Sequence, residues 1–204
     1  MVEEAIDWDS WRAAYAGMTF ADQVAFYEMC LELHPGQQSY DSAEAIGVLR
    51  KIRGWYERPL RVVELGGWDG RLGRDMLSTG LVGEWTNYDL VEPPQAVAEG
   101  YAFVRLVDWF WSGVVVDADL FVASHTIEHL SLPHLQLLAG CLTTDWVHLQ
   151  APLEREPRAW AGYPGSHILE VGWDGVDDVL ANVGYLPWGN GLWRQMDCDR
   201  LSPS

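Results

Sequence analysis

From residue 59 onward the chain alternates short apolar runs with stretches of helical periodicity, and this alternation restricts the possible folds most. Each run is rich in β-branched or aromatic residues and is short enough to form one buried strand. The runs are RVVEL at 61–65, WTNYDL at 85–90, AFVRLV at 102–107, DLFVAS at 119–124 and WVHLQA at 146–151. Such runs joined by helices predict an α/β fold, in which a mostly parallel central sheet is flanked by helices.

Helices are predicted before the first strand, between the strands and after the fifth apolar run. Residues 71–80 read as a helix that ends at Gly80, and residues 177–182 read as a late helix before a final strand at 192–199. Before the first strand, Thr19–Leu33 has a capping threonine and one apolar stripe, and a second helix is expected over Ser42–Tyr56. We therefore expect a helical N-terminal segment, 1–58, packed on a core domain formed by 59–204.

Charge and composition exclude several classes of partner. The net charge is -17 and Lys51 is the only lysine, so a nucleic-acid phosphate backbone would be repelled. The sequence has no apolar stretch of membrane-spanning length and no signal peptide, and its three cysteines form no disulfide framework. We expect an unprocessed, soluble, cytoplasmic protein with a small-molecule substrate and no membrane partner, whose oligomeric state is open.

A glycine-containing loop follows the first predicted strand, at Glu64–Gly70 (ELGGWDG). Ligands of open parallel sheets bind beyond the carboxyl ends of the strands, where glycines let the backbone approach a ligand closely. The loop lacks the Gly-Lys-Ser/Thr ending of a P-loop. Two patterns remain, the dinucleotide fingerprint G-x-G-x-x-G and the loop acidic-x-G-x-G-x-G, and in both Trp68 replaces one glycine.

Acidic residues end the next two predicted strands. Asp89 closes the second strand, where a carboxylate can accept hydrogen bonds from ribose hydroxyls, as both nucleotide-binding patterns require. Asp108 and Trp109 close the third strand, and DADLFVASHTIEHL at 117–130 contains the fourth.

The order and spacing of these motifs over roughly residues 60–200 resemble the class I (Rossmann-like) S-adenosylmethionine-dependent methyltransferase superfamily. The resemblance implies a Rossmann-like sandwich that binds S-adenosylmethionine and transfers its methyl group to an acceptor. It implies a cofactor site made of Glu64, Gly66, Gly67, Trp68, Gly70, Asp89, Leu90, Asp108, Trp109 and Ser124. A catalytically inactive binding module and a nucleotide-binding oxidoreductase remain as alternatives.

Two histidines are candidates for catalysis. His125 directly follows the fourth strand, where it would face the methyl group or the acceptor, and His167 follows the glycine-rich turn 162–165. His125–His129 also spells the H-x-x-E-H zinc-protease pattern, but it follows a strand rather than lying within a helix, so we expect no metal. Glu128 and His129 are instead expected to cap and pack the next helix.

The carboxyl half is rich in tryptophan. Trp160, Trp173, Trp188 and Trp193 are compatible with an apolar or aromatic acceptor pocket.

Overall fold

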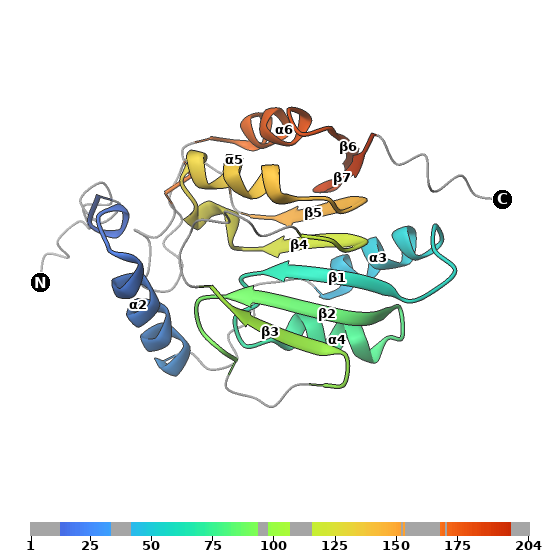
Figure 1. The fold of residues 1–204 in the computed structure, drawn as a ribbon, viewed down its shortest axis with the longest axis horizontal. Coiled ribbons are helices and arrows are strands. Elements are labelled where there is room, and N and C mark those ends of the chain that lie inside the picture. The colour runs from blue at the N-terminus through green and yellow to red at the C-terminus, as the bar shows by residue number, and fades with distance from the viewer. Residues whose placement is uncertain are drawn as a thin grey trace, which may run out of the picture.

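A seven-stranded sheet forms the centre of the computed structural model (Figure 1), which describes residues 13–33, 42–93, 98–106, 116–151, 153, 168–169 and 171–196. The strand order is β3-β2-β1-β4-β5-β7-β6. The strands are β1 (Leu60–Leu65), β2 (Val82–Asp89), β3 (Tyr101–Arg105), β4 (Leu120–Ser124), β5 (Trp146–Gln150), β6 (Tyr185–Gly189) and β7 (Leu192–Gln195). The first five strands run parallel to one another, whereas β7 runs antiparallel to its two neighbours, β5 and β6. The predicted α/β fold is thereby confirmed.

The five apolar runs became β1 to β5, with boundaries that shift by one to a few residues. The strand β6 was not predicted from the sequence, and it pairs with β7 through a tight hairpin. Asn190 and Gly191 form the turn, and both have positive φ, of 54° and 65°. A two-residue turn with two positive φ angles matches the right-handed twist of the strands it joins, and Asn-Gly is its commonest sequence.

Alternating strand residues divide the core into two layers, one on each face of the sheet, because successive side chains of a strand point to opposite faces. One layer joins Val63, Phe121 and Val147 with residues of α5 (Leu132–Cys141) and α6 (Trp173–Ala181). The other joins Val62, Leu120 and Trp146 with residues of α3 (Ser42–Arg53) and α4 (Arg71–Ser78). The sheet therefore has helices on both faces, as the sequence predicted.

The predicted lead-in helix is α2 (Phe20–Leu33), and its amino terminus carries a reciprocal cap. The Asp22 backbone N–H donates to Thr19 Oγ1 at 3.2 Å, and the Thr19 N–H donates to Asp22 Oδ2 at 3.0 Å. In Figure 1, α2 lies off the end of the sheet toward which β1 and β2 point. The division of the chain at residues 58 and 59 stays a prediction.

Two helix boundaries differ from the sequence prediction. The helix expected to reach Tyr56 ends at Arg53, where the Arg53 side chain donates to the Tyr56 carbonyl and closes a turn. The late helix α6 begins at Trp173, earlier than expected, because Gly172 and Gly175 obscure its periodicity. No helix in the described part of the chain is both long and apolar enough to cross a membrane.

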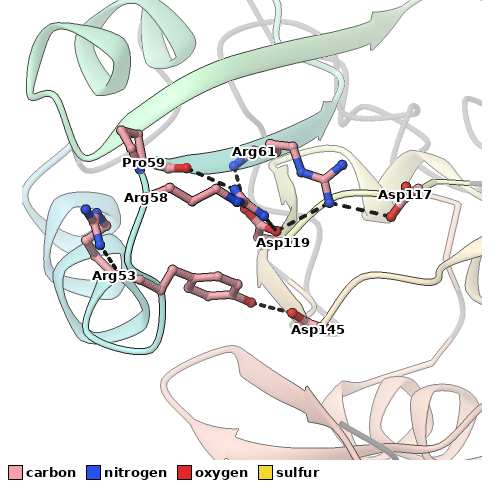
Figure 2. Close-up of polar contacts among 8 residues, drawn as sticks. Arg53, Arg58, Pro59, Arg61, Asp117, Asp119 and Asp145 are labelled. Carbon is pink, nitrogen blue, oxygen red and sulfur yellow. Dashed lines mark hydrogen bonds and ion pairs between the residues drawn. The ribbon is translucent and has the colours of Figure 1, made fainter. Parts of the chain in front are cut away.

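A buried carboxylate joins the amino-terminal ends of β1 and β4 (Figure 2). Asp119, whose side chain is only 4% exposed, accepts two hydrogen bonds of 2.7 Å from the Arg58 guanidinium and one of 2.7 Å from the Arg61 backbone N–H. These donors hold the pKa of Asp119 below its usual range although burial opposes them. Nearby, the Tyr56 hydroxyl donates to Asp145 at 2.6 Å. This network fixes the sheet at the edge opposite the glycine-containing loop.

We expect Asp119→Ala to lower the free energy of unfolding by about 1–3 kcal/mol, because it leaves buried donors without their acceptor. Arg58 is half-exposed, so solvent reduces the loss below that of a fully buried pair. Asp117→Ala is the matched control, since Asp117 is 72% exposed and lies 3.7 Å from Arg61. Urea unfolding at neutral pH measures the free energy of unfolding of both variants. An equal loss of stability in the two variants would contradict the role assigned to Asp119.

Candidate functional site

The loop after β1 turns sharply through left-handed backbone conformations. Gly66 and Gly70 have φ of 75° and 73°, and Trp68 has φ of 51°. Trp68 therefore adopts the backbone conformation that a glycine would adopt without strain. A side chain at Gly66 would collide with Thr126, whose hydroxyl donates to the Leu65 carbonyl at 3.1 Å. The loop is thus packed directly against the turn that follows β4.

Gly67 lies over two polar side chains of the neighbouring strands. Its N–H donates to Asn87 Oδ1 at 3.0 Å, and a Cβ there would lie 2.5 Å from Glu64 Oε2. Glu64 is 2% exposed and accepts a 2.8 Å hydrogen bond from the Trp85 indole N–H. Burial raises the pKa of Glu64 to about 8, and the nearby carboxylates of Asp89 and Asp69 add to the rise. Glu64 therefore packs against the loop at Gly67, and near neutral pH its carboxyl group is mostly protonated.

Asp89, at the end of β2, ties the loop to the strand beside it. Its Oδ2 accepts from the Trp68 N–H at 3.0 Å and its Oδ1 accepts from the Leu90 N–H at 2.6 Å. Burial raises its pKa to about 6, although hydrogen bonds from the backbone of Leu90, Trp68 and Val91 lower it. A carboxylate offers roughly four acceptor positions, so one position remains for a ligand hydroxyl. Leu90 itself is buried in the core at 3% exposure.

The turn after β4 holds the candidate residues Ser124 and His125. Ser124 Oγ donates to Gln150 Oε1 at 3.1 Å, and the His125 N–H donates to the Gln150 carbonyl at 2.7 Å. His125 has a positive φ of 51°, which is uncommon for a residue with a side chain and often marks a functional turn. The structure thus brings Ser124 and His125 beside the loop of β1, at the same edge of the sheet.

His125 faces a second buried carboxyl group. Its Nδ1 lies 3.7 Å from Glu128 Oε1, and Glu128 Oε2 is buried with no hydrogen-bond partner among the described residues. Burial raises the pKa of Glu128 to about 8 and lowers the pKa of His125. Near neutral pH the pair is therefore mostly an uncharged acid beside an uncharged imidazole.

The structure corrects the expectation that Glu128 and His129 cap the next helix. They form a short 3-10 helix, η1 (Ile127–His129), and Ser131 caps α5 by accepting the His134 N–H at 3.4 Å. No group of three or more metal-binding side chains occurs in the described residues, where His125 and His129 do not share a helix.

The lead-in helix α2 contributes a residue that sequence reasoning placed only in an apolar stripe. Tyr27 packs against His129 with ring centroids 6.0 Å apart, and its hydroxyl lies 2.9 Å from that of Tyr15. Burial raises the pKa of Tyr27 well above its usual value, and the nearby carboxylates Glu128 and Asp89 raise it further. Tyr27 therefore lies close to both acidic groups at the carboxyl edge of the sheet.

A pocket of about 650 Å³ opens beside His125, on the side away from the β1 loop. It lies between the carboxyl end of β5, the β6–β7 hairpin, α6 and the start of α3. Its lining includes Glu44, His125, Gln150, Trp173, Asp177, Asn190 and Trp193. Of the four tryptophans considered from the sequence, Trp173 and Trp193 line this pocket. Trp188 packs against Trp146 instead, and Trp160 lies outside the described residues.

Three of the predicted site residues, Asp108, Trp109 and His167, also lie outside the described residues. The other predicted residues gather at the ends of three adjacent strands, β2, β1 and β4. His125 lies between this group and the pocket. The Asn-Gly turn of the hairpin was the sequence signal that could have located the pocket wall.

Comparison with solved structures finds the same fold in methyltransferases. The chain matches the 1,6-didemethyltoxoflavin-N1-methyltransferase of Burkholderia thailandensis, solved with 1,6-didemethyltoxoflavin and S-adenosylhomocysteine bound, at a TM-score of 0.60 and 18% identity over 97% of this chain and 94% of that one. It matches human N-acetylserotonin methyltransferase in complex with SAM at a TM-score of 0.50 and 14% identity over 91% and 70% of the two chains.

One further match carries a different activity. The [4+2]-cyclase SpnF aligns at a TM-score of 0.50 and 14% identity, over 74% of this chain and 60% of that one. The sequence itself matches no protein-family profile and none of the curated proteins. The two methyltransferase matches and the strand order show that the chain has the Rossmann-like fold of the class I S-adenosylmethionine-dependent methyltransferases, as its motifs predicted.

We expect Gly67→Ala to destabilise the protein by about 1–3 kcal/mol, because the added methyl group would overpack the loop. The methyl would lie 2.5 Å from Glu64 Oε2 and 2.7 Å from Asn87 Cγ. Gly47→Ala is the control, since a Cβ at this helical position meets nothing within 4 Å. That change should stabilise α3 by about 0.5–1 kcal/mol, and thermal unfolding of the two variants should shift in opposite directions.

The buried carboxyl groups predict that stability falls as pH rises. The folded protein holds protons on Glu64 and Glu128, with pKa values of about 8, that the unfolded chain has already released. The folded state thus binds more protons, and each group should lower the free energy of unfolding by about 1 kcal/mol per pH unit up to about pH 8. Urea unfolding between about pH 7 and 8 lies above most histidine titration in the unfolded chain, which is centred near pH 6.5.

Glu64→Gln and Glu128→Gln should each reduce this slope, because glutamine cannot ionise. Glu57→Gln, at an exposed position, should leave it unchanged. A slope that stays the same in both buried variants would mean that the two carboxyl groups are ionised in the folded protein.

Proposed function

We propose that this protein transfers a methyl group from S-adenosylmethionine to a small-molecule acceptor. The observation that carries the proposal is the convergence of a left-handed, glycine-containing loop, a strand-end carboxylate and His125 at one edge of the sheet. Structures with this fold and with S-adenosylhomocysteine or SAM bound support it.

The residues present fit such a cofactor. Gly66, Gly67 and Gly70 place no side chain on the loop before α4, so a ligand could approach the loop backbone closely. Asp89 retains acceptor capacity for a ribose hydroxyl. The Trp68 indole N–H is a buried donor with no hydrogen-bond partner in the described residues, so it is available to a ligand. Glu64, Leu90 and Ser124 would shape the site, and Asp108 and Trp109 remain proposed members.

The sulfonium of S-adenosylmethionine supplies an already activated methyl group, so the protein must mainly orient the acceptor and exclude water. His125 lies at the border of the pocket, where it could remove a proton from an acceptor hydroxyl or ammonium group. Burial lowers the pKa of His125, so its imidazole is neutral and able to accept a proton at neutral pH. His167 remains a second proposed base.

Calorimetric titration tests this proposal. We expect S-adenosylhomocysteine to bind and NADH not to bind. Binding of NADH alone would favour an oxidoreductase, and binding of neither would favour an interaction module. Asp89→Ala should weaken S-adenosylhomocysteine binding by about 1–3 kcal/mol through lost hydrogen bonds.

Glu84→Ala, at the exposed start of the same strand, is the control for Asp89→Ala. Asp89→Asn keeps one acceptor oxygen for the loop, so it tests the ligand contact if the alanine variant fails to fold. Unchanged affinity in folded Asp89 variants would remove Asp89 from the proposed site.

A further inference from the structure

The pocket beside His125 has an aromatic wall. The rings of Trp173 in α6 and Trp193 in β7 stack with centroids 6.0 Å apart and planes inclined by 25°. Trp193 is almost fully buried, but Trp173 is 37% exposed although it is large and apolar. An indole held in this way offers a flat face to an aromatic ligand, and it is the strongest of the aromatic side chains in binding cations.

The same pocket is acidic. Asp177 in α6 and Glu44 in α3 enter its lining from helices on opposite faces of the sheet. No lysine or arginine occurs among the described residues that line it. Asp177 Oδ1 accepts the Trp193 indole N–H at 2.7 Å, which orients the carboxylate and leaves its other acceptor positions available to a ligand. A carboxylate of this kind attracts a cationic group and repels an anionic one.

The backbone of the hairpin closes the pocket on its third side. Gly191 has φ of 65°, and a Cβ there would collide with the Leu149 carbonyl. Asn190, with φ of 54°, also lines the pocket. The part of the wall formed by the hairpin is thus fixed by tight backbone contact.

We propose that this pocket binds the methyl acceptor, and that the acceptor is a flat aromatic molecule carrying a protonated amine or another cationic nitrogen. The inference rests on the proposed function, because it treats His125 as the residue between cofactor and acceptor. The aromatic part stacks on Trp173, and the cationic group is recognised by Asp177 and Glu44.

Three probes of similar size and shape test the charge preference: 2-(1-naphthyl)ethylamine, which is cationic, 2-(1-naphthyl)ethanol, which is neutral, and 1-naphthaleneacetate, which is an anionic carboxylate. Each is titrated calorimetrically into the full chain in the presence of saturating S-adenosylhomocysteine. We expect the amine to bind about tenfold more tightly than the alcohol, and the carboxylate to bind most weakly. Equal affinities, or a preference for the carboxylate, would overturn the proposal.

Asp177→Asn keeps an acceptor for the Trp193 indole while removing the charge, so it should fold and bind the amine several-fold to tenfold more weakly. Glu44→Gln should act in the same direction. Asp178→Asn, an exposed neighbour on the same helix, should leave amine affinity unchanged. In all three variants the alcohol serves as a neutral reference, and its affinity should change little.

The two proposals fail in different ways. If S-adenosylhomocysteine binds but the amine shows no advantage, the cofactor assignment stands and the acceptor assignment is wrong. If S-adenosylhomocysteine does not bind, the probes are titrated alone. Amine binding that Asp177→Asn weakens then supports the pocket chemistry and refutes the methyl-transfer proposal.

Discussion

The carboxylate of Asp89 joins two elements that must stay together for this fold to offer a ligand site. It accepts hydrogen bonds from the backbone N–H of Leu90, at the end of its own strand, and from the backbone N–H of Trp68 in the neighbouring loop. The loop could otherwise adopt other turns, because its glycines restrict the backbone little. With these bonds in place, Trp68 is held at a positive φ, Gly67 lies on Glu64 and Asn87, and Gly66 lies against Thr126. The conformation of the β1 loop therefore depends on the same group that we propose as a cofactor contact.

The carboxyl edge of the sheet also contains two buried acidic groups, Glu64 and Glu128, whose pKa values burial raises to about 8, whereas Asp89, with a pKa of about 6, stays mostly ionised near neutral pH. Acids that stay protonated in the folded state present donors as well as acceptors, and they avoid the cost of burying charge. The net charge of -17 thus overstates the negative charge at the centre of the molecule. The carboxylates of the adjacent pocket, Asp177 and Glu44, belong to a more open environment.

The sequence predicted the parts of this structure that depend on local pattern. Buried parallel strands such as β1 and β4 are continuous apolar runs, and the Thr19–Asp22 cap is a short-range signal, so both were found. What was missed depends on contacts between distant residues. The strand β6 is mostly exposed and contains Pro187, so its composition does not indicate a strand without its partner β7. Likewise, nothing in the local sequence indicates that Tyr27 lies beside Glu128, or that Trp173 and Trp193 stack across a pocket.

The position of α2 has a consequence for how the chain acquires its structure. Tyr27 is synthesised early, but its ring partner His129 belongs to the turn after β4, far later in the sequence. Contacts of such long sequence separation form slowly, because a large loop must close before they can stabilise anything. Until β4 has formed, the side chains of Phe20, Val24 and Tyr27 lack the apolar surface against which they pack. Docking of α2 therefore requires the turn after β4, and it completes the edge of the sheet where the candidate site lies.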